Sequence, residues 1–258
     1  MGLIRIRRCR AASRMALVVA CLSLPLLASG CGEIKDIGEE LGWIKREEAR
    51  SLPVEDTSLA SHWIPADNAV DDASQARWSE RWWQWVGRFA QAQGKPYLDP
   101  DGSLCAQHQD QGPVWFLAGT DGNFDAVRTC RVPAGKHLFV PLITWVVTHD
   151  IVGEMSCAQK QEQARRFADH VVSGLVLLDG RPVGELQRMR VASDACFTSP
   201  DGLSGASDGY WLMLKPLPPG KHQLAVAATF RDGPRQTMQN FRYELEVDGL
   251  PGEAGALQ

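Results

Sequence analysis

Four residues around position 150 carry side chains that could hold a metal ion or move a proton. His149, Asp150 and Glu154 lie within six positions, and His137 lies in the apolar segment before them. Imidazoles and carboxylates serve as zinc ligands and as general bases. The spacing matches neither the H-E-x-x-H nor the H-x-H pattern. We therefore keep these four residues as candidates for catalysis and predict no metal and no cofactor.

Tryptophan is the second chemical feature, with nine residues, all beyond position 30. Trp78, Trp82 and Trp85 recur at a helical spacing, which favours packing of one helix face against the core. Trp83 breaks this stripe. An exposed indole offers a large rigid face and one hydrogen-bond donor. Trp83 is therefore the candidate for binding a sugar ring or an apolar partner.

The N-terminus resembles an export signal. An arginine cluster precedes an apolar run, Met15–Ala28, that is too short to cross a bilayer and has the length of a signal-peptide core. The segment Leu27-Ala28-Ser29-Gly30-Cys31 resembles the lipobox of bacterial lipoproteins. The resemblance implies that residues 1–30 are removed and that the thiol of Cys31 takes a diacylglycerol.

The charge and the predicted anchor limit the kinds of partner that we expect for the mature chain. Lipoproteins kept in the inner membrane often carry Asp after the acylated Cys, whereas Gly32 and Glu33 follow here, so the resemblance favours the outer membrane. The net charge is -4, and loss of residues 1–30 removes five arginines and no acid, which leaves -9. We expect a membrane partner through the lipid on Cys31, a protein or glycan partner in the envelope, and no nucleic acid.

Four cysteines remain in the body: Cys105, Cys130, Cys157 and Cys196. An even number in an exported chain indicates disulfides, and four cysteines allow three pairings. We favour the nearest-neighbour closures, Cys105 with Cys130 and Cys157 with Cys196. A four-cysteine zinc site is the alternative, but the paired C-x2-C spacing typical of such sites does not occur.

The elements that position these residues follow from periodicity. Residues 31–73 are interrupted by Pro53 and Pro65 and are predicted to be a lipidated N-terminus and tether. A single domain is predicted over 74–250, with helices near 74–91 and 158–171, followed by a tail at 251–258. Asp72 or Ser74 is expected to cap the first helix.

The rest of the domain is predicted to form short strands. Residues 114–118, 137–145 and 171–178 are rich in β-branched and aromatic residues, and apolar residues alternate over 224–230 and 241–247. Asp179-Gly180 predicts a hairpin turn between the strand at 176–178 and a segment at 183–191. The fold class predicted is mostly β, an antiparallel β-sandwich with two flanking α-helices.

Several motifs resemble those of a family of exported bacterial proteins with no assigned function. They are Trp82-Trp83-Gln84-Trp85, Gly112–Gly119, Cys130–Lys136 and Asp208–His222. The resemblance implies secretion and a β-rich body and transfers no catalytic residue. Similar proteins usually carry an Asn and an acidic residue after the proline at Pro141, where this chain has Leu142-Ile143.

Two functions remain open from the sequence. The first is a membrane-anchored envelope lipoprotein whose disulfide-crosslinked β-sandwich is a binding or structural module. The second is an envelope hydrolase or metal-dependent enzyme that uses His137, His149, Asp150 and Glu154. We prefer the first, because no complete catalytic constellation is visible in the sequence.

Overall fold

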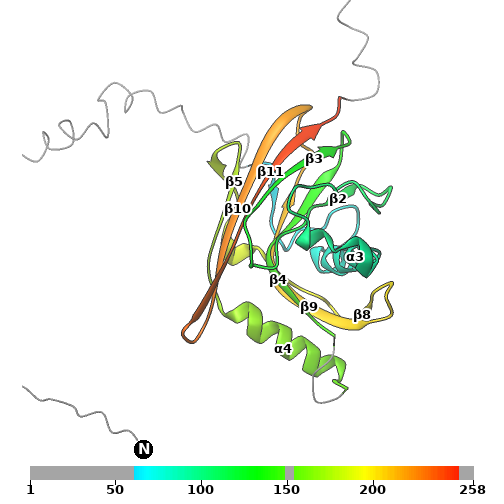
Figure 1. Cartoon of the computed structure of the whole chain (residues 1–258), viewed down its shortest axis with the longest axis vertical. Coiled ribbons are helices and arrows are strands. Elements are labelled where there is room, and N and C mark those ends of the chain that lie inside the picture. The colour runs from blue at the N-terminus through cyan, green and yellow to red at the C-terminus, as the bar shows by residue number, and fades with distance from the viewer. Residues whose placement is uncertain (1–60, 149–153, 250–258) are drawn as a thin grey trace, which may run out of the picture. The chain divides into compact units, whose positions relative to one another are not determined.

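The computed structural model describes residues 61–148 and 154–249, which form a β-rich body with two sheets (Figure 1). The first sheet has the order β1-β9-β4-β2, with β7 and β8 also paired to β9. Its strands are β1 (Trp63–Ile64), β2 (Val114–Phe116), β4 (His137–Val147), β7 (Arg190–Ala192), β8 (Phe197–Thr198) and β9 (Ser204–Leu214).

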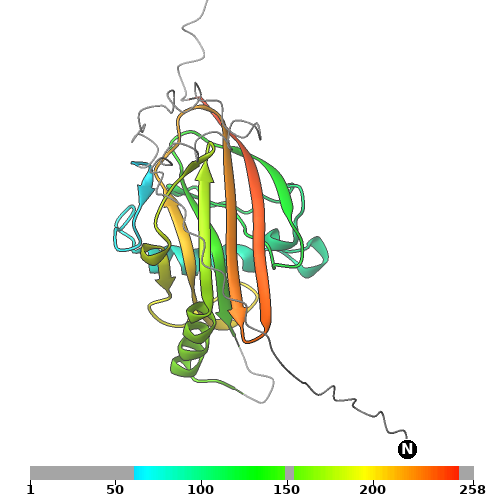
Figure 2. The same ribbon diagram turned by 90° about the vertical axis from the view of Figure 1, so that its left-hand side faces the viewer.

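The second sheet has the order β3-β11-β10-β5-β6. Its strands are β3 (Ala126–Val132), β5 (Val171–Leu178), β6 (Arg181–Pro182), β10 (Gly220–Asp232) and β11 (Arg235–Val247). Figure 2 shows β5, β10 and β11 side by side, with their long axes nearly aligned. The alternating strands predicted over 224–230 and 241–247 lie within β10 and β11.

The two sheets share one buried cluster of side chains. Leu138 and Leu212 of the first sheet meet Val226 and Leu245 of the second in this cluster. Along β11, buried and exposed residues alternate over Gln239–Val247. This period of two turns one side of the strand into the core and leaves the other in water.

The prediction of purely antiparallel sheets was wrong, because each sheet contains a parallel pair. β2 pairs in parallel with β4, and β3 pairs in parallel with β11. Parallel neighbours need a long connection. The chain between β2 and β4 supplies one by passing through β3 of the other sheet. Alternation of apolar residues shows which face of a strand is buried, but it does not show the direction of the neighbouring strand.

Helix α3 (Gln75–Gly87) covers the outer face of the first sheet. Its N-cap is Ser74, whose hydroxyl accepts a hydrogen bond from the backbone N–H of Arg77. Trp78, Trp82 and Trp85 are buried in a second cluster with Phe139 and Trp211 of the sheet. The predicted tryptophan stripe and one of the two predicted caps are therefore confirmed. The helix ends at Gly87, and a short 3-10 helix, η2 (Gln91–Gln93), follows it.

Helix α4 (Cys157–Asp169) is the second predicted helix. It packs against the N-terminal part of β9 (Figure 1). Ser156 caps it with a reciprocal capping box, in which the Gln159 side chain accepts from the Ser156 backbone N–H. Lys160 extends from the helix and donates to the carbonyl oxygen of Ser204, at 2.7 Å.

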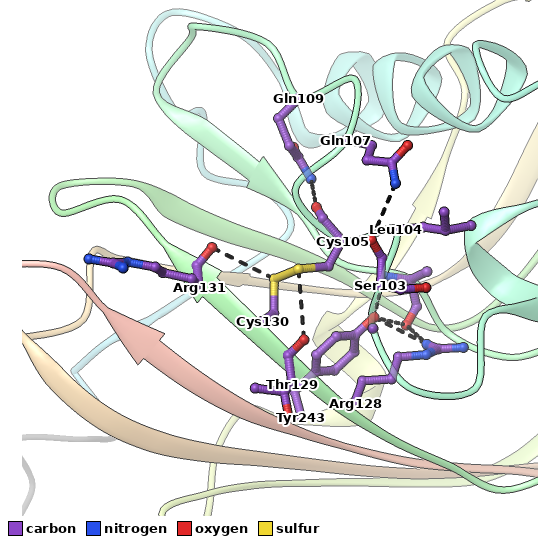
Figure 3. The surroundings of a disulfide bond; sticks show 12 residues. Ser103, Leu104, Cys105, Gln107, Gln109, Arg128, Thr129, Cys130, Arg131 and Tyr243 are labelled. Atoms are coloured by element: carbon purple, nitrogen blue, oxygen red, sulfur yellow. Dashed lines mark hydrogen bonds between the residues drawn. A yellow bond between two sulfur atoms is a disulfide. The ribbon is translucent and has the colours of Figure 1, made fainter.

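Both disulfides have the pairing that the sequence favoured. Cys105 bonds to Cys130 and joins the loop after the 3-10 helix η3 (Pro96–Leu98) to β3, as Figure 3 shows. Cys157 bonds to Cys196 and joins the start of α4 to the chain before β8. The structure thus confirms the two predicted disulfides.

The hairpin turn at Asp179-Gly180 is present, with φ of 51° and 77°. These two positive values are those of a type I′ turn, which Asp-Gly favours. The segment at 183–191 is not one strand, however, since β6 spans Arg181–Pro182 and the 3-10 helix η4 (Leu186–Arg188) separates it from β7. Gly184 has a positive φ and closely approaches Met189 and Trp63, which breaks the strand there.

Residues 61–73, placed in the tether by the sequence, contribute to the body. β1 pairs with the end of β9, with Trp63 opposite Leu214. Within the described residues, no helix has the length and apolar character needed to cross a bilayer.

Candidate functional site

The catalytic candidates do not come together in the described structure. His137 is the first residue of β4, and its backbone pairs in register with β2. Glu154 is exposed and lies just before the Ser156 cap of α4, which is fastened to the start of β9 by the Lys160–Ser204 bond. His149 and Asp150 lie outside the described residues.

Strand geometry fixes the separation between His137 and Glu154. β4 and β9 are antiparallel, and Leu138 lies opposite Leu214, at the far end of β9 from Ser204. Ten residues of strand span about 33 Å. The two side chains therefore lie at opposite ends of the sheet. Over residues 61–148 and 154–249, no group of three or more His, Cys, Asp or Glu side chains could hold a metal ion.

His137 is nevertheless a perturbed group. Burial lowers the pKa of its imidazole below the ordinary range, against opposing contributions from the Pro113 backbone and the charge of Asp71. Its Nδ1 is buried without a hydrogen-bond partner among the described residues. The neutral ring is thus the form that this environment favours.

Trp83, the aromatic binding candidate, lines a cavity of about 420 Å³ between α3, β4 and the β10–β11 hairpin. We call it the aromatic cavity. Its volume lies within the range of small-molecule sites. Its lining residues are Trp82, Trp83, Tyr97, Gly119, Thr120, Asp121, Gly122, Pro141, Ile143, Thr144, Trp145, Val146, Phe230, Arg235, Thr237 and Gln239.

A β-bulge in β4 builds one wall of the aromatic cavity. The register with β9 shifts between Pro141 and Ile143, so that Leu142 and Ile143 both belong to the core between the sheets. The bulge reverses the alternation from there on and turns Trp145 toward the second sheet. Trp145 meets Phe230 of β10 there, with ring centroids 5.1 Å apart.

Two polar atoms of the lining are buried without a partner. They are the indole Nε1 of Trp83 and the amide Oε1 of Gln239, a residue only 9% exposed. An unsatisfied buried polar group costs about 1–3 kcal/mol. Neither atom has surface open to the cavity, so both are features of the packing around it rather than contacts offered to a ligand.

Glycines let the loop after β2 approach the cavity closely. A Cβ on Gly119 would lie 2.9 Å from Gln239 Oε1 and 3.3 Å from the carbonyl oxygen of Pro141. Gly122 has a φ of +82°, and a Cβ there would meet Thr237 at 2.8 Å. Glycine at positions 119 and 122 therefore allows the loop to place Thr120 and Asp121 at the cavity.

The described lining of the aromatic cavity holds one charged side chain of each sign. Asp121 and Arg235 are its only acid and base, and Asp121 is fixed by bonds from the Asn123 backbone and side chain. The pKa of the Tyr97 phenol is raised by burial and by the charges of Asp121 and Asp201. The phenol therefore stays neutral and able to donate.

A buried ion pair lies outside the cavity. Arg190 of β7 donates through Nε and Nη2 to the carboxylate of Asp208, a residue 4% exposed, and through Nη1 to Asp169 of α4. The two carboxylates raise the pKa of the guanidinium, with Asp208 contributing most. The groups satisfy one another, so this cluster fastens α4 to the first sheet.

The sequence named Trp83, which lines the cavity, as its binding candidate and named no other lining residue in that role. Gln239 and Thr237 lie on β11, at positions of the alternating pattern that face inward. A polar residue at such a position was the only sign in the sequence that they line a cavity. Trp145 gave no such sign, because its direction depends on the bulge. Pro141, which cannot donate to the ladder, marked the place where the strand departs from regular pairing.

The body is thus a β-rich domain with an aromatic, partly polar cavity at one face. No family model and no curated protein matches the chain. Among solved structures, it is similar to the solution structure of amebosin, with 13% sequence identity and a TM-score of 0.22, over 53% of this chain and 100% of that chain. A likeness at this level carries no information on fold or function.

Proposed function

We propose that the protein is a lipid-anchored binding module of the bacterial cell envelope. The lipobox-like segment ending at Cys31 supports the anchor, and Gly32-Glu33 after it supports the outer membrane. Two disulfides, Cys105–Cys130 and Cys157–Cys196, fit a chain that folds in an oxidising compartment.

The observation that carries the binding function is the aromatic cavity itself, whose lining includes four half-buried aromatic side chains, Trp83, Tyr97, Trp145 and Phe230. We propose that a β-sandwich frame, whose two sheets share one core, holds this cavity open. The motifs around Trp82–Trp85 and Asp208–His222 support membership of the exported family that they resemble.

The hydrolase alternative receives less support. His137 and Glu154 lie at opposite ends of the β4–β9 pair, and a general base must reach the same substrate atom as its partner groups. The cavity, by contrast, gathers aromatic and neutral polar groups, which suits binding.

The anchor is tested by replacing the acylated cysteine. We expect wild-type protein in the membrane fraction with an acyl mass on Cys31, because stable anchoring needs more than one lipid chain. Cys31→Ser should accumulate as an unacylated precursor. Cys21→Ser, a matched change inside the signal segment, should behave as wild type. Recovery of Cys31→Ser with its acyl mass and membrane fraction unchanged would refute the anchor.

A further inference from the structure

We propose that His222 is a pH-sensitive latch, which closes one end of the two-sheet body when its ring carries two protons. The latch joins the crossover between the two sheets, residues 215–219, to the β5–β6 turn at Asp179-Gly180. It depends on neither the lipid anchor nor a ligand in the aromatic cavity.

The ring of His222 lies between two oxygen atoms that come from different segments. Its Nδ1 is 2.8 Å from Oδ2 of Asp179, and its Nε2 is 2.9 Å from the carbonyl oxygen of Pro218. The His222 side chain is only 12% exposed. The protein, rather than water, therefore supplies the partners of both ring nitrogens.

Both oxygen atoms accept hydrogen bonds and have none to give. A backbone carbonyl carries no proton, and neither does an ionised carboxylate. A neutral imidazole has one N–H and can satisfy only one of these oxygens, whereas an imidazolium donates from both nitrogens. The doubly protonated ring is therefore the form that makes both bonds.

The bond to Pro218 is the one that a neutral ring loses. Asp179 is fixed by Gln223, whose backbone N–H donates to Oδ1 at 2.8 Å and whose carbonyl accepts from the Asp179 N–H at 2.8 Å. A bond to a charged acceptor is about twice as strong as one to a neutral acceptor. A single proton therefore stays on Nδ1, and Nε2 then faces the Pro218 carbonyl with a lone pair.

The released segment is part of the frame. Residues 215–219 lead from β9 of the first sheet to β10 of the second. Leu217 in this crossover is 5% exposed and packs in the core cluster that the two sheets share. Loss of the Pro218 bond therefore loosens the place where the chain passes from one sheet to the other.

The charges around the ring favour the second proton at close range. His222 lies opposite buried Leu245, so the residues that alternate with these two face the other side of the sheet. Arg181, opposite Leu178, is a cation on the inner side, whereas the charge at hydrogen-bond distance is the negative one of Asp179. The outward or exposed charges nearby are Lys215, Lys221, Glu244 and Glu246.

Histidine is the side chain that changes its charge between about pH 5 and pH 8. The latch is therefore closed in mildly acidic solution, and its Pro218 bond is lost as the pH rises through this range.

The experiment measures amide hydrogen exchange of the full-length protein in detergent at pH 5 and pH 8, as protection factors corrected for the intrinsic pH dependence of exchange. Amides of β4, in the first sheet, are the reference for changes in global stability. We expect protection of Lys215 and Gly220, at the two ends of the crossover, to be about threefold to tenfold lower at pH 8.

Asp179→Asn separates the latch from other causes of pH dependence. The amide donates to Nδ1, so that a neutral ring can accept there and donate from Nε2 to Pro218. Asparagine also tolerates the φ of 51° at this position. Protection at the crossover should then be equal at pH 5 and pH 8.

Two histidine variants complete the test. His222→Gln removes the titrating ring and should give low protection at both pH values. His170→Gln is the matched control, because His170 is exposed and its ring contacts Phe230 at the other end of β10. It should behave as wild type.

The latch is overturned if wild type and Asp179→Asn show the same pH dependence, or if protection at the crossover of the wild type does not change between pH 5 and pH 8. Should Asp179→Asn fail to fold, His222→Gln decides, since a pH dependence that persists without the ring also overturns the latch.

Discussion

Arg128 of β3 is buried to 1% exposure beside Tyr243 (Figure 3) and donates to three backbone carbonyls. Its Nε donates to the carbonyl of Asp99 at 2.7 Å, and its Nη1 donates to those of Ala118 and Gly119 at 2.6 and 2.9 Å. The hydroxyl of Tyr243 also accepts from Nη1, at 3.1 Å. Arg128 thereby positions the loop that enters the aromatic cavity.

Replacement of this arginine should destabilise the fold strongly. Arg128→Met leaves buried carbonyls without donors, and we expect the free energy of unfolding in urea to fall by about 3 kcal/mol. Arg131→Met is the control, because Arg131 lies on the same strand with 73% of its side chain exposed. It should change stability by less than about 0.5 kcal/mol. Equal losses in the two variants would contradict the role of Arg128.

His137 should make stability depend on pH. Burial lowers its pKa in the folded state, so between the ordinary imidazole range and the lowered value the unfolded chain binds more protons. Stability is therefore present above the unfolded pKa and is lost as the pH falls toward the folded one. We expect the urea midpoint to drop less between pH 7 and pH 5 in His137→Gln than in wild type. An identical drop in both proteins would exclude this contribution.

For single residues, the sequence predicted which side chains have a special role better than it predicted which segments pack around them. The four disulfide cysteines were predicted correctly because their number and spacing are visible along the chain. Trp83 could be named as a binding candidate because it breaks the helix stripe. Arg128 and Gln239 could not be named, since both lie on alternating strands where a polar residue normally faces water. Only the partner segments, many residues away, make their burial favourable.

Among the elements, the two disulfides differ in exposure. Cys130 and Cys105 are 1% and 8% exposed, whereas Cys157 is exposed at the first position of α4. Each crosslink should contribute roughly 3–4 kcal/mol through loop closure. The two disulfides are therefore expected to differ in how easily a reductant reaches them, and not in how much they stabilise the fold.

Mild reduction should open the Cys157–Cys196 bond first. We expect brief treatment with dithiothreitol, followed by alkylation and peptide mapping, to label Cys157 and Cys196 before Cys105 and Cys130. Backbone amides of α4 should then exchange faster, since a crosslink at its first turn is lost. Simultaneous labelling of all four cysteines would show that the buried pair is not protected.

Helices α3 and α4 and the strands β10 and β11 could be predicted because each buries one face and its period shows it. Strand β5 could be predicted because its sequence is rich in β-branched residues. The bulge in β4 and the break after β6 could not. The bulge reverses the alternation of inward and outward residues, and the break interrupts it. Both depend on contacts with segments that are distant in the sequence. The cavity wall depends on the bulge, so the site was less predictable than the frame that supports it.

For the whole molecule, the proposed function combines a lipid anchor at Cys31 with a body that two disulfides crosslink. Removal of residues 1–30, as proposed, would leave a charge of -9, which makes broad attraction to anionic lipid unfavourable. In the proposed function, attachment therefore depends on the acyl chains on Cys31, and the body of two mixed sheets presents the aromatic cavity.

The intact mass of protein extracted from membranes tests this account most directly. The account predicts a chain that begins at Cys31, carries diacylglycerol and an added acyl group, and lacks four hydrogens because both disulfides are formed. An unprocessed chain with Met1 still attached, no acyl mass and all cysteines reduced would contradict it.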